Sequence, residues 1–357
     1  MSPRALLVLL LGTACQVPQG NEPGFGGTPE HTSSAATGAD QSSSQGASET
    51  SVGGSGELST SAEHGDDTTP VILDVGNSAD IGDGAPAGCK GKIDFLFVIS
   101  RDGLVDILQD RLIAAFPDFI ATIEGKFADF DYHIMVVDSD ASWGLSQCDD
   151  ACAEAGTCAE VQDYPCDKLA LVTQCDRMMG AGNVFSAGWN AYNEPCEIAG
   201  GRRFLNRDQP DLLEAFTCIA QVGNSGMARL GDALGAAVST QLAGIGGCND
   251  RFLRDDALLM VTLIGGWDVV GSNIGSSGSP EAWAKAVVDA KNGDANSVVM
   301  LDIGDPSFPE SDSIWKLTQL FRFGLVTSML ASDYGSAFEA ATGLVEEACA
   351  GFVPPAN

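Results

Sequence analysis

An almost unbroken apolar run occupies residues 93–99 of this 357-residue chain, directly after Lys92. A strand with one wet face would alternate apolar and polar residues, so this run predicts a strand that is covered on both faces. A polar loop at residues 100–103 follows, and apolar residues then recur at helical spacing over residues 104–123. Ligands of parallel α/β sheets bind at the carboxyl ends of the strands, so the loop that starts at Ser100 marks the expected site.

The same alternation continues along the chain and predicts one large α/β domain at residues 88–355. Ser279 is expected to cap one of its helices, with Pro280 in the first turn. The order of elements predicts a doubly wound, mostly parallel sheet with helices on both faces. The further predicted strands are residues 132–137, 258–264, 297–303 and 324–330, and the further helices are residues 211–222, 227–242, 280–292, 311–321 and 334–350.

The start of the chain has the pattern of an export signal. Arg4 supplies a positive end, and residues 5–11 form an apolar core that is too short to span a bilayer. Residues 11–15 resemble a bacterial lipobox, in which the cysteine is lipidated after cleavage. We therefore expect residues 1–15 to be a signal peptide, Cys15 to carry lipid, and the protein to lie in the cell envelope, anchored at the outer membrane or cell surface. Ordinary cleavage and secretion is the alternative.

A polar segment at residues 16–87 separates this signal from the predicted domain. It is rich in Ser, Gly, Thr and acidic residues, and it contains no Lys or Arg. Such a composition cannot bury enough apolar surface to offset the entropy of ordering the chain. We expect a disordered tether that holds the domain away from the membrane.

The cysteine count suits an exported protein with disulfides. The chain has eleven cysteines, so ten remain when Cys15 carries lipid, which is an even number. Zinc is the competing use of clustered cysteines, but no C-x-x-C pair occurs and the chain has only three histidines. The ten candidates for disulfides are Cys89, Cys148, Cys152, Cys158, Cys166, Cys175, Cys196, Cys218, Cys248 and Cys349.

Six of these cysteines lie at residues 148–196, in a region with many Gly, Asn, Asp and Pro residues. The region has too little apolar content for a core of its own, so residues 141–206 are expected to form an insertion stapled by about three disulfides. Its place after the second strand puts it near the carboxyl edge of the sheet. Cys218 and Cys248 flank a predicted helix and are another candidate pair.

Charge and motifs argue against nucleic acid and against catalysis. The formal net charge is −31, whereas a phosphate-binding surface needs Lys and Arg. Neither a phosphate-binding G-x-x-x-x-G-K-[ST] loop nor a G-x-S-x-G elbow is present. His133, the one histidine beyond the polar segment, lies inside a predicted strand, where a structural role is expected. Carboxylates are numerous enough for a glycosidase-type pair, so a hydrolase of unfamiliar type stays open as the least favoured alternative.

Two of the strands resemble those of a von Willebrand factor A (VWA) domain. The first is Lys-Ile-Asp-Phe-Leu-Phe-Val-Ile at residues 92–99, followed by its polar loop, and the second is the run at residues 258–264 with its approach from Phe252. The closing helix, which contains Cys349 and precedes Phe-Val-Pro-Pro at residues 352–355, resembles the end of exported bacterial members. The resemblance extends in element order over about residues 91–355. It implies the VWA fold and a non-enzymatic binding role.

The metal-ion-dependent adhesion site of that family is degenerate here. Its first motif, Asp-x-Ser-x-Ser, corresponds to Ser100, Asp102 and Leu104, so a charge and a ligand are lost. The Asp that ends the second strand in the family is replaced by Gly, and Asp268 lies about two residues beyond. Ser225 is the hydroxyl nearest to the family's threonine ligand. Since Mg²⁺ needs a near-octahedral set of oxygen ligands, the expectation is that no cofactor binds.

Two other metal sites are conceivable from the sequence. Asp102, Asp138 and Asp268 each follow or end a predicted strand, so they would form a shifted Mg²⁺ or Ca²⁺ site where they converge. Residues 138–142 also have oxygens at alternate positions, as in a calcium loop, but Trp143 stands where that loop needs Gly.

The two ends of the predicted domain are expected to be joined. Cys89 precedes the first strand and Cys349 ends the last helix. The ends of a doubly wound domain can lie close together, so Cys89–Cys349 is the expected clasp.

The sequence therefore predicts a non-enzymatic cell-surface binding or adhesion module that meets a protein or surface ligand at the carboxyl edge of its sheet. The first alternative is a structural envelope lipoprotein that binds nothing, because the insertion buries that edge. The second is a metal-binding VWA domain with a shifted site. Membrane attachment through the lipid and no contact with nucleic acid are common to these readings.

Overall fold

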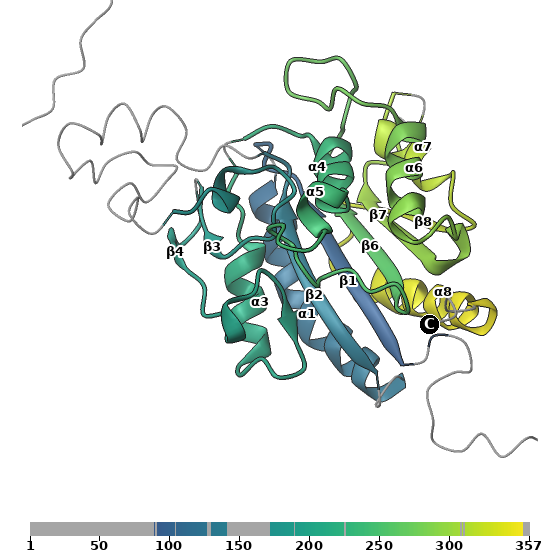
Figure 1. The fold of residues 1–357 in the computed structure, drawn as a ribbon. Helices are drawn as coiled ribbons and strands as arrows, with labels where there is room; N and C mark the ends of the chain where they lie inside the picture. The colour runs from purple at the N-terminus through teal and green to yellow at the C-terminus, as the bar shows by residue number, and fades with distance from the viewer. Residues whose placement is uncertain are drawn as a thin grey trace, which may run out of the picture. The chain divides into compact units, whose positions relative to one another are not determined.

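The computed structural model describes residues 89, 91–103, 105–126, 130–140, 172–188, 190–224, 226–307, 309 and 311–352. They form an α/β domain built on a six-stranded sheet in the order β5-β2-β1-β6-β7-β8 (Figure 1). All neighbouring strands run parallel, except that β5 is antiparallel to β2. The strands are β1 (Lys92–Ile99), β2 (Asp131–Asp138), β5 (Leu205–Asn206), β6 (Leu258–Ile264), β7 (Val298–Gly304) and β8 (Phe323–Ser328).

Helices pack on both faces of this sheet. Helices α1 (Val105–Lys126), α3 (Leu212–Ala220) and α8 (Gly335–Gly351) share one apolar cluster with the sheet. On the other face lie α4 (Leu230–Ala237), α6 (Pro280–Ala290) and α7 (Ser313–Thr318), in a second cluster. The remaining short elements are α5 (Thr240–Ala243), the antiparallel pair β3 (Phe185–Ser186) and β4 (Glu194–Pro195), and the 3-10 turns η2 (Cys175–Arg177), η3 (Ala199–Gly201) and η4 (Ala295–Ser297).

The central strand β1 is buried on both faces, as its apolar run predicts. Ile93, Phe95, Phe97 and Ile99 face the cluster of α1, α3 and α8, whereas Leu96 and Val98 face the other. β1 pairs with β6 along its length, so the two strands that carry the VWA resemblance are neighbours in the sheet interior.

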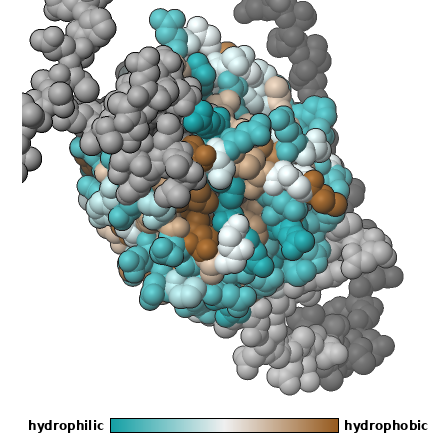
Figure 2. Space-filling model, turned by 60° about the vertical axis from the view of Figure 1, so that its left-hand side comes forward, coloured by the Kyte–Doolittle hydropathy of each residue, from teal (hydrophilic) through white to brown (hydrophobic). Residues whose placement is uncertain are grey.

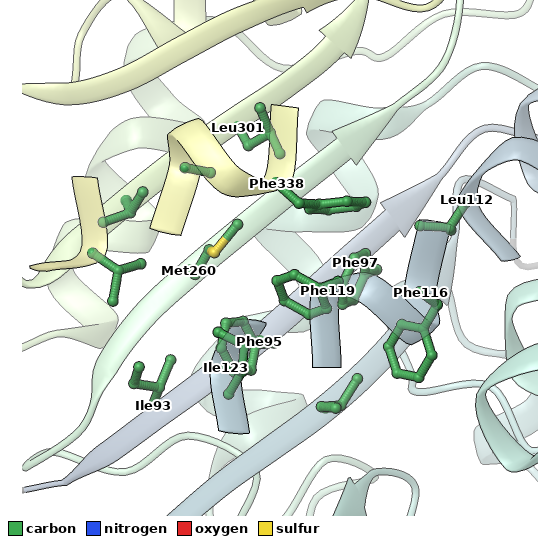
Figure 3. Packing of buried hydrophobic residues seen from close by; sticks show 14 of the residues in the cluster. Ile93, Phe95, Phe97, Leu112, Phe116, Phe119, Ile123, Met260, Leu301 and Phe338 are labelled. Carbon is green, nitrogen blue, oxygen red and sulfur yellow. The ribbon is translucent and has the colours of Figure 1, made fainter. Parts of the chain in front are cut away.

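Aromatic rings fill the first cluster (Figure 3). Phe119 of α1 meets the rings of Phe95 and Phe97 edge-on, at centroid distances of 5.2 and 6.0 Å. Phe338 of α8 lies 4.8 Å from Phe119, and Phe216 of α3 lies 5.3 Å from Phe97. Edge-to-face contacts of this kind add to the free energy gained by burying the rings. This cluster fixes the three helices against the sheet.

The second cluster depends on one close helix contact. Gly231 of α4 lies under the Trp283 ring of α6, and a Cβ at Gly231 would stand 2.5 Å from ring carbons. Only glycine therefore allows α4 and α6 to approach this closely. Their packing places the start of α4 beside the carboxyl ends of β1 and β6.

Three disulfides lie within the described residues. Cys89–Cys349 joins the start of β1 to the end of α8, which confirms the expected clasp. The candidate pair Cys218–Cys248 is wrong, because Cys248 bonds to Cys175 and Cys218 bonds to Cys196. The insertion therefore does not bond only to itself. Cys175 and Cys196 instead attach it to the body of the domain.

Several predicted boundaries need correction. Residues 227–242 form two helices, because the chain turns at Val238 and the Ser239 hydroxyl accepts a bond from the Leu242 amide to begin α5. The predicted insertion at 141–206 ends too late, since Leu205 pairs with Ile134 as part of β5. A strand of two residues has no periodicity by which sequence analysis could detect it.

Other expectations fall outside the described residues. These are the signal peptide, the lipid on Cys15, the tether at residues 16–87, and the first part of the insertion, with Cys148, Cys152, Cys158 and Cys166. Among the helices that the structure describes, none has the length and apolar composition needed to cross a bilayer.

Candidate functional site

The carboxyl ends of β1 and β6 lie side by side and begin the candidate site. The Ser100 amide donates to the Ile264 carbonyl at 2.8 Å, and the Gly265 amide donates to the Ile303 carbonyl at 3.3 Å. A Cβ at Gly265 would stand 2.7 Å from the Cβ of Ser100, so glycine is needed where the two chains meet. The loops that follow these strands are thereby held together at one edge.

Ser100 and Asp102 occupy this edge together. Ser100 is buried, and its hydroxyl accepts a hydrogen bond from the Asp102 amide at 3.2 Å. Asp102 is partly exposed, and one carboxylate oxygen lies 3.3 Å from where a Cβ of Gly266 would be. The positions that the resemblance matches to metal motifs in the first and second strands are therefore adjacent. They bring together one hydroxyl, one carboxylate and a glycine.

Asp268 lies nearby but is a structural residue. It is fully buried, and its oxygens accept from the Gly231 amide at 2.9 Å, the Ser276 amide at 2.7 Å and the Ser276 hydroxyl at 2.6 Å. Burial raises the pKa of this carboxyl, and these hydrogen bonds oppose the rise. Asp268 thus ties the loop after β6 to the start of α4, and its oxygens already have partners.

We expect Asp268→Asn to lower the free energy of unfolding by about 2 kcal/mol, because an amide cannot accept all three bonds and leaves buried donors unsatisfied. Urea denaturation would measure this loss. Hydrogen exchange should also speed up in residues 269–276, which Asp268 anchors. Unchanged exchange in that loop would contradict the anchoring role.

Asp138 does not join the other carboxylates. Its place in β2 continues the alternation of Ile134 and Val136, so its side chain points to the face covered by α1, α3 and α8. Asp268 bonds to α4 on the opposite face. Burial raises the pKa of Asp138 to about 6, and the positive charge of Arg101 opposes this rise. The geometry therefore does not support convergence of Asp102, Asp138 and Asp268.

Arg101 also lies at this edge, and sequence analysis did not identify it as a site residue but only as part of the polar loop at residues 100–103. It is 1% exposed and belongs to the largest fully buried side chains of the domain. Its guanidinium reaches the loop at Gly188, and its charge acts on Asp138. Its backbone is held by Gly226, whose amide donates to the Arg101 carbonyl at 2.7 Å. A buried cation of the protein itself therefore lies at the edge where the family holds a metal.

The loop from β2 closes the same edge. The Ser139 amide donates to the Ile99 carbonyl at 3.0 Å, and its hydroxyl bonds to the Met227 carbonyl. One Asp140 oxygen accepts from the Met227 amide at 3.2 Å. These contacts engage Ser139 and Asp140 of the segment that resembles a calcium loop, whose residues 141–142 fall outside the described residues. Ser225, the remaining candidate ligand, and Trp143 fall outside the described residues.

The residues present do not fit the metal that the family resemblance implies. In the described part of the chain, no group of three or more His, Cys, Asp or Glu side chains is arranged to hold a metal ion. Ser100 is neutral, Asp268 is committed to backbone amides, and Asp138 lies on the other face. Of the carboxylates that the structure describes at this edge, Asp102 is partly exposed and one Asp140 oxygen already accepts from the Met227 amide, whereas Mg²⁺ requires about six oxygens.

Two buried carboxyls next to this edge were missed by sequence analysis. Asp302 lies in β7, two residues before its end at Gly304, with 2% exposure, and its Oδ2 has no hydrogen-bond partner in the described structure. Burial, together with the charge of Asp312, raises the pKa of Asp302 well above its ordinary value. Asp312 caps α7 by accepting from the Ile314 amide at 2.9 Å, and burial raises its pKa to about 6. Asp302 sits inside an apolar strand run, which gives no sequence signal for a functional role.

The loop after β6 presents apolar side chains to solvent at this edge. Trp267, Val269, Val270 and Ile274 are 47%, 38%, 39% and 53% exposed. The loop is rigidly held, because the Ala228 amide donates to the Ile274 carbonyl at 2.9 Å and Asp268 binds Ser276. The Asp305 carboxylate accepts hydrogen bonds from Ser307 and from the Trp267 side chain, and these bonds, above all those of Ser307, lower the pKa of that carboxyl. The arrangement is a fixed apolar surface, which we call the edge loop, residues 267–274.

No family model and no curated protein matches this chain. Among solved structures, proximal thread matrix protein 1 from the mussel byssus is similar over 73% of this chain and 48% of that chain. The chain therefore spans about half the length of that protein. Sequence identity is 11% and the TM-score is 0.34, a likeness too weak to carry an argument about fold or function.

Proposed function

We propose that this protein is a non-enzymatic binding module of the cell envelope, with a doubly wound VWA-like domain that meets a protein ligand without a metal ion. The sequence supports the envelope location through the export signal, the lipobox-like residues before Cys15 and the polar tether. The fold supports the VWA-like reading in one respect: the two strands that carry the resemblance are adjacent and central.

The edge loop is the observation that carries this proposal. Its four exposed apolar side chains lie at the carboxyl edge, where ligands of parallel sheets bind. Exposed apolar groups that are held rigidly cost little ordering entropy when a partner covers them, and Trp is enriched at the energetic centres of interfaces. Because Asp268 holds the loop in place, this surface exists before a ligand arrives.

The chemistry of the donors supports metal independence. In the VWA family, cation and carboxylates at this edge balance one another. Here the guanidinium of Arg101 supplies positive charge beside Asp138, and Asp268 is satisfied by amides and a hydroxyl. Ligand binding would then depend on apolar contacts of the edge loop rather than on a coordinated ion.

Beads coated with the full chain should adhere to a layer of the producing cells equally well with and without EDTA, and Trp267→Ala should reduce adhesion severalfold. Leu320→Ala is the matched control, because Leu320 is 51% exposed and precedes β8 at the opposite edge. Loss of adhesion in EDTA would refute metal independence. Equal adhesion of the two variants and the parent would favour a structural envelope protein.

Calorimetric titration of Mg²⁺, Mn²⁺ and Ca²⁺ into the full chain gives a second test, and no saturable heat is expected. Asp102→Ala is the variant to compare, since Asp102 is the carboxylate best placed at the edge. A micromolar response that disappears in Asp102→Ala would revive a metal-dependent site.

A further inference from the structure

A groove of about 770 Å³ lies on the flank of the domain, between α3 and residues 192–199. This volume is in the range of about 300–1,000 Å³ that is typical of ligand sites. Its lining combines apolar side chains, among them Ile198, with carboxylates. Figure 2 shows the side of the molecule to which α3 belongs, where a patch of hydrophobic surface lies among mostly hydrophilic residues.

The walls of the groove are fixed by covalent and hydrogen bonds. The Cys196–Cys218 disulfide joins residues 192–199 to α3. The Gln209 side chain accepts from the Ala199 amide at 2.9 Å and donates to the Glu197 carbonyl at 2.9 Å. A preformed groove of this kind loses little conformational entropy when it is filled.

Four carboxylates line the groove, and no basic residue does. They are Glu194 and Glu197 on one wall, and Asp211 and Glu214 at the start of α3. Within the described residues, none of the four side chains takes part in an ion pair or hydrogen bond. Other acids of the domain, by contrast, bind cations directly, as Asp176 binds Arg203.

Helix stability explains half of this charge. Asp211 and Glu214 are favourable at the amino end of α3, where the helix dipole is positive. Glu194 and Glu197 belong to the opposite wall, where Glu194 lies in β4 and Glu197 precedes the short turn η3. Neither Glu194 nor Glu197 has a cationic partner among the described residues, and a cationic ligand would supply one.

We propose that this groove binds a Lys- or Arg-rich segment of a partner protein. Its positive side chains would pair with the four carboxylates, and Tyr192, 63% exposed at the rim, would pack on its stem or stack on a cation. The chain's own segment at residues 16–87 is excluded as occupant because it has no Lys or Arg. A second copy is disfavoured by the net charge of −31.

A metal ion is also a poor fit, since no described group of carboxylates is close enough to hold one. The site is separate from the edge loop and does not depend on the proposed metal-free adhesion. Trp267→Ala should leave it intact, so failure of one proposal does not imply failure of the other.

Fluorescence anisotropy of a short labelled Lys-Gly repeat peptide tests the proposal with the full chain. At about 0.15 M salt, charges more than about 8 Å apart are screened, so local carboxylates decide the affinity. The variant E194Q/E197Q/E214Q should weaken binding about tenfold to a hundredfold. The control E124Q/E281Q/E339Q removes the same charge from exposed acids on other helices and should change affinity less than about twofold.

Tyr192→Ala tests the packing contact separately, because it leaves the charge of the groove unchanged. It should lower the affinity for the peptide severalfold. Equal weakening in the site and control variants would show that general negative charge attracts the peptide and would overturn the proposal. Spermine is the alternative ligand. If it binds as tightly as the peptide and is weakened equally by E194Q/E197Q/E214Q, the groove binds a small polyamine and not a protein segment. Thermal unfolding of each variant verifies that the fold is retained.

Discussion

Replacing Cys89 and Cys349 together by alanine is expected to lower the free energy of unfolding by about 5 kcal/mol. The bond joins residues 260 apart and closes nearly the whole domain into one loop. Its removal frees the unfolded chain, whose entropy gain rises with the logarithm of loop length. Both cysteines are fully buried against the core, so the lost sulfur contacts add to the effect. Urea denaturation under oxidising conditions measures the loss.

The Cys196–Cys218 bond provides the matched control, because it spans only 22 residues. Its double alanine variant should lose about 3 kcal/mol in the same chain-entropy account, clearly less than the clasp. Equal losses would mean that local contacts of the sulfurs, rather than loop closure, determine the contribution of each bond.

Five of the strands, β1, β2, β6, β7 and β8, could be predicted because each is long enough to carry a signal of its own. The apolar run of β1 and that of β6 require cover on both faces, and only the interior of a parallel sheet provides it. Ser279 with Pro280 marked the start of α6, where the serine hydroxyl accepts from the Ala282 amide. These signals lie in consecutive residues, so the sequence alone was enough to locate the elements.

The site could be predicted only as a location. Asp268 was a candidate ligand because it follows a strand, but its bonds to Gly231 and Ser276 depend on how α4 and the edge loop fold against each other. Arg101 gave no signal, since its burial depends on loops around Gly188 and Gly226. Disulfide partners likewise depend on tertiary distances, which is why Cys248 was paired wrongly.

Buried carboxylates are stabilised by different groups at the two edges of the sheet. At the carboxyl edge, the charge of Arg101 acts on Asp138, and Asp268 is held by Gly231 and Ser276. At the amino edge, Asp94 of β1 is fully buried, and Arg254 binds it through both its side chain and its backbone, each at 2.8 Å. Arg254 also contacts the Asp131 carboxylate at 2.5 Å and thereby joins β1, β2 and the approach to β6. The contribution of this second cluster to the free energy of unfolding can be tested by replacing Arg254.

Arg254→Met should lower the free energy of unfolding by about 3–5 kcal/mol near neutral pH, because it leaves Asp94 as a buried charge without its main partner. Lys291, whose charge also acts on Asp94, and His133, 3.6 Å away, remain beside it. Burial already raises the pKa of Asp94 to about 6 although Arg254 and Lys291 oppose the rise. Without Arg254 this pKa should rise further.

The sign of the pH dependence follows from that shift. A carboxyl whose pKa is higher in the folded state than in the unfolded chain binds protons on folding, so its contribution to stability falls as pH rises from about 4 through the folded pKa. The loss caused by Arg254→Met should therefore be largest at about pH 8 and clearly smaller at about pH 5, where Asp94 is mostly neutral in the folded protein. Urea denaturation at both pH values measures it, and Asp94→Asn combined with Arg254→Met should recover much of the loss. A loss that is equal at both pH values would mean that packing and hydrogen bonds of Arg254, rather than the charge it offsets, stabilise this edge.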